Sequence, residues 1–236
     1  IGRLDVATTI ICDNNPNFNL IPNGYEGQLY LIIQPLSFML TAQPGVSVSQ
    51  LRFYYNNQNI IDDAELKIEF AKQPLLYNSN ESIKQEYVEI NNGLLTHIDL
   101  KKDIVSYRAR KDERLGPINL SLKDTYDVDE YWECIKKPKD DWLILNPGDF
   151  YLFSTKEITY VPPHLAFEIM ATREIHGNIQ VHSAGFADPG FKASLTLEMR
   201  CRDSPIRMVD GQPIATLQYE RLRKEPDIKY GDQQLG

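Results

Sequence analysis

The chain is dominated by short stretches in which apolar and polar residues alternate. The clearest stretch follows a tight Asp-Pro-Gly turn within residues 181–200, VHSAGFADPGFKASLTLEMR. Successive side chains of a strand point to opposite faces, so the two faces can be read directly from the order of residues. One face carries Leu195, Leu197 and Met199, and the other carries Ser194, Thr196, Glu198 and Arg200. The pattern predicts a half-buried strand with a carboxylate on its polar face.

The rest of the chain repeats this kind of pattern. Short runs rich in Val, Ile, Leu, Tyr and Phe are separated by Gly, Pro and Asn turns at close intervals, which is typical of an all-β barrel or sandwich. Residues 141–165, DWLILNPGDFYLFSTKEITYVPPHL, predict two strands and their turns. Helical periodicity is weak almost everywhere. The best helical candidate is DVDEYWECIKKP, where Asp127 or Asp129 caps the first turn and Pro138 ends the segment.

An internal repeat links the two halves of the chain. Residues 24–53 align without a gap to residues 190–219, at an offset of 166. The identical pairs are Gly24 with Gly190, Leu29 with Leu195, Leu31 with Leu197, Gly45 with Gly211 and Leu51 with Leu217. Such a match indicates duplication of a supersecondary unit. A polar, Asn-rich stretch precedes residue 94, so we expect two tandem all-β domains, 1–94 and 95–236.

Composition excludes several classes of protein. The 236 residues contain no apolar run near the roughly 20 residues that cross a bilayer, so we expect no membrane partner. No signal peptide is visible, although the chain starts at Ile1 in what reads as the middle of a motif. A net charge of −8 argues against a nucleic acid polymer as partner, because that affinity needs clustered Lys and Arg. Single nucleotides remain open as partners.

Cysteine and histidine usage argues against zinc chemistry. Cys12, Cys134 and Cys201 lie far apart and are odd in number, which favours reduced thiols in a cytoplasm. Zinc nucleobase deaminases need an H-x-E and a P-C-x-x-C. None of the four histidines has such neighbours, so we expect no zinc.

Several motifs, taken in order, resemble those of one family. LNPGDFYLFSTKEITYVPPHL, VHSAGFADPGF, LTLEMR and DGQPIATLQYERL are similar to the successive signatures of dCTP deaminases, in the dUTPase-like β-clip superfamily. The terminal KYGDQQLG is similar to that family's K-Y-x-x-Q tail, and IGRLDV, NGYEGQLYL and PGVSVSQLRF follow the same order in the first copy. The tandem two-domain form is the nearest match, which implies two β-clip (distorted barrel) domains with little helix.

The resemblance implies hydrolysis of the 4-amino group of dCTP, giving dUTP and ammonia without a catalytic metal. Glu198 matches the family's glutamate, which acts as general base on a bound water. Water is a weak nucleophile at neutral pH, so the reaction needs a group that takes its proton. A solvated outer residue of an ordinary strand is the alternative reading of Glu198.

Departures from the family pattern suggest a site shared by the two copies. Residues 171–178, ATREIHGN, do not restore the family's S-S-x-x-R, and Gly177 falls where the arginine is expected. The first copy keeps Arg3 in that frame but has Ile32 at the position of the general base. The first copy thus keeps the arginine but lacks the general base, and the second copy keeps the general base but lacks the arginine. We therefore expect Arg3 to face Glu198 and to stabilise negative charge on the attacked ring or on phosphate.

The resemblance also assigns residues to substrate binding. His182, Ser183 and Ala184 hold the pyrimidine edge and the water, Asp188 lies near the deoxyribose, Phe191 stacks on the sugar, Lys229 and Tyr230 contact the triphosphate, and Gln233 closes over the nucleotide. Simpler roles also account for some of these residues. An aspartate that opens a Pro-Gly turn follows from turn chemistry alone, and an aromatic after a turn is often core.

The family resemblance also implies a cofactor, an assembly and a set of alternative reactions. Family members bind the triphosphate with Mg²⁺, which chelates phosphate oxygens and is not held directly by the protein. Sites shared between subunits imply a homo-oligomer. A dUTP pyrophosphatase, a bifunctional deaminase and pyrophosphatase, and an inactive nucleotide-binding regulatory protein are the alternative functions, and a structural interaction module is the most remote.

Overall fold

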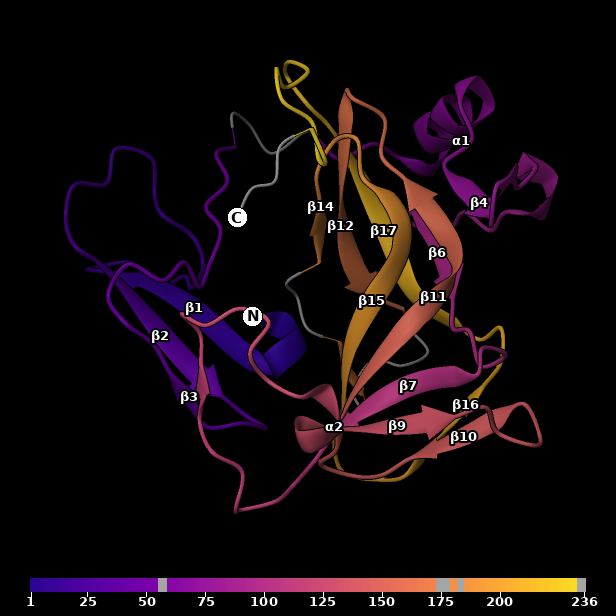
Figure 1. Cartoon of the computed structure of the whole chain (residues 1–236). Helices are drawn as coiled ribbons and strands as arrows, with labels where there is room; N and C mark the ends of the chain where they lie inside the picture. Colours follow the sequence, from indigo (N-terminus) through magenta and orange to yellow (C-terminus); the bar gives the residue numbers. More distant parts are fainter. Residues whose placement is uncertain (55–58, 173–178, 182–184, 233–236) are drawn as a thin grey trace. The chain divides into compact units, whose positions relative to one another are not determined.

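The computed structural model describes residues 1–54, 59–172, 179–181 and 185–232 (Figure 1). The chain forms two compact units. Unit 1 contains Ile1–Phe53 and Ala109–Glu133, and unit 2 contains Tyr54–Arg108 and Cys134–Gly236. Strands predominate over helices in the described residues, so the predicted all-β class is confirmed.

Unit 1 is built from short elements around one β-hairpin. Its elements are η1 (Gly2–Leu4), β1 (Val6–Cys12), β2 (Leu29–Pro35), β3 (Leu40–Thr41), β8 (Ile118–Asn119) and α2 (Val128–Tyr131). β1 and β2 pair antiparallel, whereas β3 and β8 form a short parallel pair. Phe38 is buried between Tyr131 and Trp132, with ring centroids 5.9 and 5.2 Å away in edge-to-face contacts. These aromatic rings are the main packing of the unit.

The predicted helix near residue 127 is present but short. Asp127 caps α2, because its carboxylate accepts a hydrogen bond from the backbone N–H of Asp129. The helix ends at Tyr131 and not before Pro138, since the chain continues directly into strand β9 (Trp132–Lys136). The sequence Trp-Glu-Cys-Ile-Lys contains an aromatic and a β-branched residue, which are enriched in strands.

Unit 2 consists of two larger sheets and one short pair. The larger sheet has the order β13-β15-β11-β4-β5, with β7 joined to β11 and β9 joined to β7. The second sheet has the order β14-β12-β17-β6, and β10 pairs with β16. The strands are β4 (Leu76–Asn78), β5 (Glu81–Ser82), β6 (Leu94–His97), β7 (Ile104–Ala109), β10 (Trp142–Leu145), β11 (Phe150–Tyr160), β12 (Leu165–Ala171), β13 (Ile179–Val181), β14 (Phe186–Ala187), β15 (Lys192–Cys201), β16 (Ile206–Val209) and β17 (Pro213–Arg221).

The core of unit 2 lies between these sheets. Alternate residues of β15 and β11 turn inward, including Leu197, Met199 and Phe153. They meet Phe167 and Tyr219 from the second sheet, whose rings lie 5.2 Å apart. The buried Tyr219 hydroxyl donates a hydrogen bond to the carbonyl of Tyr160, 2.9 Å away, so its polar atom is satisfied. The predicted strands of residues 141–165 are β10 and β11.

An irregularity interrupts the antiparallel pairing of β11 with β15. Ser154 lies opposite Thr196, but the next paired residues are Ile158 and Ser194. Residues 155–157 of β11 thus face only Leu195 of β15, which is a β-bulge with two extra residues. Because the excess is even, inward-facing residues remain inward on both sides of the bulge. β11 and β15 pair regularly both before and after the bulge, and the two strands lie side by side (Figure 1).

A helix that the polarity pattern did not single out packs on unit 2. α1 (Asp63–Lys72) is capped by Asp62, whose carboxylate accepts a hydrogen bond from the Glu65 backbone N–H at 2.8 Å. Glu69 on α1 is buried and is bound by Lys72, by His164 from the β11–β12 connection and by Arg221 of β17. Burial alone would raise the pKa of Glu69, but these hydrogen bonds lower it to about 2. The ionised carboxylate joins α1 to the sheet.

The compact units do not divide at residue 94. Leu94 begins β6, which pairs with β17 deep in unit 2. The repeat nevertheless has a structural counterpart, because the matching residues 29–35 and 195–201 lie in β2 and β15. The tandem origin of the two halves stays a prediction. In the part of the chain that the structure describes, no helix is long and apolar enough to span a membrane.

Candidate active site

Glu198 lies on the outer face of β15, as the alternation predicted. Leu195, Leu197 and Met199 are buried in the core, whereas Thr196, Glu198 and Arg200 are half-buried on the opposite face. The carboxylate is therefore neither in the apolar core nor fully exposed. Such a position keeps a carboxylate in reach of a bound molecule.

The surroundings of Glu198 on its own face are partly apolar. Leu152 of β11 lies directly opposite Glu198, and Tyr107 of β7 lies opposite Leu152. Directly opposed residues project to the same face of a sheet, so the three side chains form one row across three strands. All three are half-buried. The row offers a flat, mostly apolar wall with an acid at one end.

The end of β15 beyond Glu198 is tied to a turn. Gly148 has φ 73°, and its backbone N–H donates to the Cys201 carbonyl at 2.8 Å. A guanidinium N–H of Arg200 donates to the Gly148 carbonyl, also at 2.8 Å. The Cys201 backbone N–H donates to the Asp149 carbonyl at 3.1 Å. These three bonds hold the strand that carries Glu198 against the Asn-Pro-Gly-Asp turn.

The last residue of this turn, Asp149, is a buried acid. Asp149 accepts hydrogen bonds from the Tyr151 hydroxyl at 3.3 Å and from Arg108 at 3.5 Å. Burial raises the pKa of Tyr151, and the charge of Asp149 acts in the same direction. Tyr151 therefore stays protonated and acts as a donor. The network is structural support for the neighbouring strand ends.

Backbone hydrogen bonds with Val161 continue the pairing of β11 and β15 as far as the Asp-Pro-Gly turn. The Phe191 backbone N–H donates to the Asp188 carbonyl at 3.1 Å, which closes the turn. The Gly190 N–H donates to the Val161 carbonyl and the Val161 N–H donates to the Phe191 carbonyl, both at 2.9 Å. Asp188 is exposed, whereas Phe191 is half-buried and packs against the core. The turn is thereby fixed to the end of β11.

The C-terminal tail packs onto this turn. The Tyr230 backbone N–H donates to the Pro189 carbonyl at 2.9 Å, and the rings of Tyr230 and Phe191 meet edge to face at 5.3 Å. Gly190 has φ 90°, and a Cβ placed on it would stand 3.0 Å from the Lys229 Cβ. Only glycine fits both the backbone and the approach of the tail. The structure thus brings Phe191, Lys229 and Tyr230 to the turn that begins at Asp188.

The structure does not test the placement of the remaining predicted site residues. His182, Ser183, Ala184 and Gln233 lie outside the described residues. Arg3 is exposed in η1 and belongs to unit 1, whereas Glu198 belongs to unit 2. The pairing of Arg3 with Glu198 stays a prediction.

The cysteines are free thiols, and the described residues hold no metal cluster. Cys12 and Cys201 are buried and Cys134 is half-buried. Burial raises the pKa of the Cys201 thiol. Within residues 1–54, 59–172, 179–181 and 185–232, no three His, Cys, Asp or Glu side chains gather as ligands for a metal ion.

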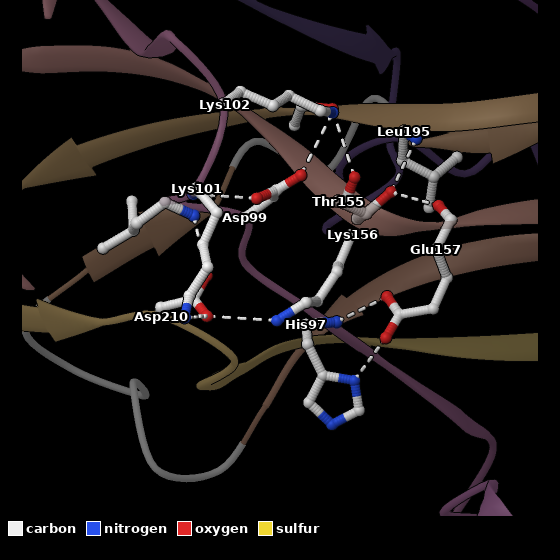
Figure 2. A network of polar contacts seen from close by, with 11 residues as sticks. His97, Asp99, Lys101, Lys102, Thr155, Lys156, Glu157, Leu195 and Asp210 are labelled. Carbon is white, nitrogen blue, oxygen red and sulfur yellow. Dashed lines mark hydrogen bonds and ion pairs between the residues drawn. The ribbon is translucent and has the colours of Figure 1, made fainter. Parts of the chain in front are cut away.

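A polar network near the β11 bulge was not predicted. Figure 2 shows His97, Glu157, Thr155 and the Leu195 backbone joined by successive hydrogen bonds, next to Asp99, Lys156 and Asp210. His97 and Glu157 are 60 positions apart in the sequence, and although Glu157 lies in the motif LNPGDFYLFSTKEITYVPPHL, nothing in that motif points to His97. Only the fold brings them together, so no local signal marks the network.

Comparison with known protein families agrees with the geometry. The sequence model for the N-terminal domain of 2'-deoxycytidine 5'-triphosphate deaminase matches residues 1–57. The model for the C-terminal domain of the same enzyme matches residues 62–236. The two matches cover nearly the whole chain and meet close to residue 60.

Individual relatives give the same result. A dCTP deaminase, dUMP-forming, of Methanobrevibacter smithii is 31% identical over 167 residues, covering 65% of this chain and 84% of the relative. A Corynebacterium diphtheriae protein of the same name is 26% identical over 190 residues, covering 77% of this chain and 89% of the relative.

A solved structure extends the likeness to the fold. The 2'-deoxycytidine 5'-triphosphate deaminase of Agrobacterium tumefaciens superposes with a TM-score of 0.84 at 30% identity. It covers 95% of this chain, which spans about two thirds (66%) of that longer chain. The predicted dUTPase-like fold agrees with this likeness. With both family domains matched, and with the turn, the tail and Glu198 placed within one unit, the chain belongs to the dCTP deaminase family.

Proposed function

We propose that this chain hydrolyses dCTP to dUTP and ammonia, with Glu198 as the base that activates water. The position of Glu198 carries the proposal. The residue is half-buried on the outer face of β15, the strand that leaves the Asp188–Phe191 turn onto which the tail packs. The names of the similar proteins support the deamination of dCTP, the step that both candidate reactions share.

In this reaction Glu198 takes a proton from water while the water oxygen bonds to C4 of the cytosine ring. Glu198 passes this proton to N3. The second proton of the water then moves from the new C4 hydroxyl, through Glu198, to the amino group as the C4–N bond breaks, which leaves the C4 carbonyl of dUTP and ammonia. Proton transfer by a positioned carboxylate accelerates such a step by roughly 10²- to 10⁴-fold. The protons and electrons balance without a redox partner.

Substrate binding falls to the turn and the tail. Phe191 offers an aromatic face for the sugar, and Asp188 lies at the mouth of the turn near the expected deoxyribose. Lys229 and Tyr230 supply a cation and a hydroxyl donor for phosphate oxygens. Mg²⁺ bound to the triphosphate neutralises part of its charge when the nucleotide is present. His182, Ser183, Ala184 and Gln233 complete the proposed set, and Arg3 reaches the site from unit 1 or from a second copy in a homo-oligomer.

Product analysis tests the reaction. The protein is incubated with dCTP, CTP and dUTP in the presence of Mg²⁺, and release of ammonia and pyrophosphate is followed separately. We expect ammonia from dCTP. Absence of ammonia under conditions where dCTP binds would contradict the proposal and would favour a nucleotide-binding regulatory role.

Variants test the role of Glu198. Glu198→Gln keeps the shape of the side chain and removes its basicity, so ammonia release should fall by roughly 10²- to 10⁴-fold. Glu168→Gln is the matched control, because Glu168 is also half-buried on a strand of unit 2 but lies in the other sheet. Equal activities of the two variants would remove Glu198 from the mechanism.

A second candidate is the bifunctional reaction that ends at dUMP. Its support is the name "dCTP deaminase, dUMP-forming" carried by the Methanobrevibacter smithii and Corynebacterium diphtheriae proteins. The same incubation decides between the two, since this reaction yields one pyrophosphate for each ammonia. Pyrophosphate from dUTP without ammonia from dCTP would instead identify a dUTP pyrophosphatase.

A further inference from the structure

The bulge in β11 separates two blocks of regular pairing with β15. In the first block, Phe150–Ser154 pair with Thr196–Arg200, and this block carries Glu198. In the second block, Ile158–Tyr160 pair with Lys192–Ser194, and this block leads into the turn with Phe191. A bulge bends its strand and increases the local twist. The geometry of the bulge therefore sets the angle between the two blocks.

One buried hydroxyl replaces the missing backbone pairing at the bulge. The Leu195 backbone N–H donates to Thr155 Oγ1 at 2.8 Å, and the same hydroxyl donates to the Glu157 carbonyl at 2.9 Å. Thr155 is fully buried. The Leu195 N–H faces the two extra residues and has this hydroxyl as its acceptor in place of a β11 carbonyl. Thr155 thus joins both strands where their ladder is interrupted.

A second contact holds the bulge from the side of β6. The Glu157 carboxylate accepts hydrogen bonds from the backbone N–H of His97 at 2.9 Å and from its Nδ1 at 2.6 Å. Hydrogen bonding to Glu157 raises the pKa of His97, against the opposite effect of burial. Figure 2 shows Glu157 reaching from its strand to His97 while Thr155 turns toward Leu195. The bulge is fixed on two sides.

We propose that Thr155 is a positioning residue that fixes the angle between the β15 block carrying Glu198 and the turn carrying Phe191. The inference rests on the proposed function, in which both residues act on one nucleotide. A misplacement of about 1 Å between a base and its substrate can cost about 100-fold in rate. Thr155 is fully buried, and its hydroxyl acts through the two strands that it joins.

The test compares two buried threonines of β11. Thr155→Val keeps the shape of the side chain but leaves the Leu195 N–H without its acceptor. Thr159→Val is the control, because the fully buried Thr159 loses one hydrogen bond, to the Ala193 carbonyl at 3.2 Å, within regular pairing, whereas Thr155 loses two at the bulge. Thr155→Ser restores the hydroxyl and is the rescue variant.

Two readouts are measured for each variant. Hydrogen exchange of the Leu195 amide should be about tenfold faster in Thr155→Val than in Thr159→Val, which corresponds to one lost hydrogen bond. For dCTP deamination, kcat should fall about 10- to 100-fold in Thr155→Val with KM changed less than about threefold. Thr155→Ser should restore both. A merely structural role would lower the stability of both valine variants alike and leave kcat of the folded protein unchanged.

His97→Gln gives a milder test if Thr155→Val does not fold. It loosens Glu157 without leaving a buried N–H unpaired, so it should accelerate Leu195 exchange and lower kcat in the same direction, by a smaller factor. Equal exchange and equal kcat in the bulge variants and in Thr159→Val would overturn the inference. If the unaltered protein releases no ammonia from dCTP, the proposed function fails, and the Leu195 exchange comparison still decides whether Thr155 fixes the bulge.

Discussion

The ring of Tyr230 stands edge to face on the ring of Phe191, with centroids 5.3 Å apart. The contact joins the tail to the turn that begins β15, although the two residues are far apart in sequence. Tyr230 is 57% exposed, so more than half of the residue remains accessible. The pair therefore serves as packing and as a potential binding surface.

Substitution of Tyr230 should weaken nucleotide binding. An aromatic pair contributes about 0.5–1.5 kcal/mol, so Tyr230→Ala should raise the Kd for dCTP roughly 2- to 10-fold. Tyr230→Phe keeps the ring and removes the hydroxyl. Calorimetric titration with dCTP separates the two contributions, since an effect of Tyr230→Phe reports a hydrogen bond to phosphate. Unchanged binding in both variants would exclude the tail from the site.

Gly190→Ala should displace the tail. The alanine meets both a left-handed backbone, φ 90°, and the Lys229 Cβ at 3.0 Å. Gly231→Ala is the control, because Gly231 has φ 89° and a Cβ added there would have no atom within 4 Å. Each change costs about 1–3 kcal/mol in backbone strain. Urea unfolding and dCTP binding are measured together, and only Gly190→Ala should also weaken binding.

The His97–Glu157 pair predicts a pH-dependent stability. The pKa of His97 is raised by its hydrogen bond to Glu157, so the charged pair contributes fully below the ordinary histidine value of 6.5. The contribution is lost as pH rises through the raised pKa. His97→Gln should therefore destabilise the protein at pH 5.5 to 6 by on the order of 1 kcal/mol and by less at alkaline pH. Glu157, Lys156 and Glu89 are the charged groups that act on His97.

The measurement is urea unfolding across this pH range, with the His97 titration followed by NMR. A stability difference between the two proteins that grows with pH would contradict the assignment. A His97 titration at or below 6.5 would contradict it as well.

Glu69 predicts a loss of stability in acid. Its pKa is lowered to about 2 from an ordinary 4.5, because the hydrogen bonds of His164, Lys72 and Arg221 outweigh burial. Stability from this group is present above pH 4.5 and is lost as pH falls toward 2. Glu69→Gln should cost about 1–3 kcal/mol at neutral pH, measured by urea unfolding.

An exposed ion pair provides the contrast for Glu69. Asp112 and Arg114 are 2.8 Å apart, but the arginine side chain is 89% exposed. Asp112→Asn should leave stability unchanged, because solvent screens such pairs. Equal losses for Asp112→Asn and Glu69→Gln would show that burial of Glu69 is unimportant.

Local patterns predicted the elements but not the contacts between them. The period of two placed Leu197 inward and Glu198 outward, because that alternation is a property of any strand. Asp127 or Asp129 was predicted as a cap, and Asp127 is the cap, whereas the predicted end at Pro138 was wrong, since Trp132 already enters a strand. α1 was missed although Asp62 precedes an acidic first turn, because Ala64, Leu66, Ile68 and Phe70 alternate with polar residues and imitate the period of a strand.

Contacts over long sequence separations lay beyond any local pattern. The family resemblance assigned Tyr230 and Phe191 to different parts of one nucleotide, but it did not predict the contact between their rings. Residues 155–157 lie in a motif that the sequence analysis quoted, but nothing in it predicted the His97–Glu157 pair or the two extra residues beside Leu195. Both depend on the register of strands that are distant in the chain, which period-two alternation does not determine.

Because the β11 bulge contains two extra residues, the parity of an insertion or deletion there decides whether the strand keeps its inward and outward sides. Removing one residue from 155–157 would exchange the inward and outward sides of the remaining strand, placing polar groups in the core. Removing two would shorten the strand while every later side chain kept its side. Insertions and deletions at this place should therefore be tolerated only in pairs.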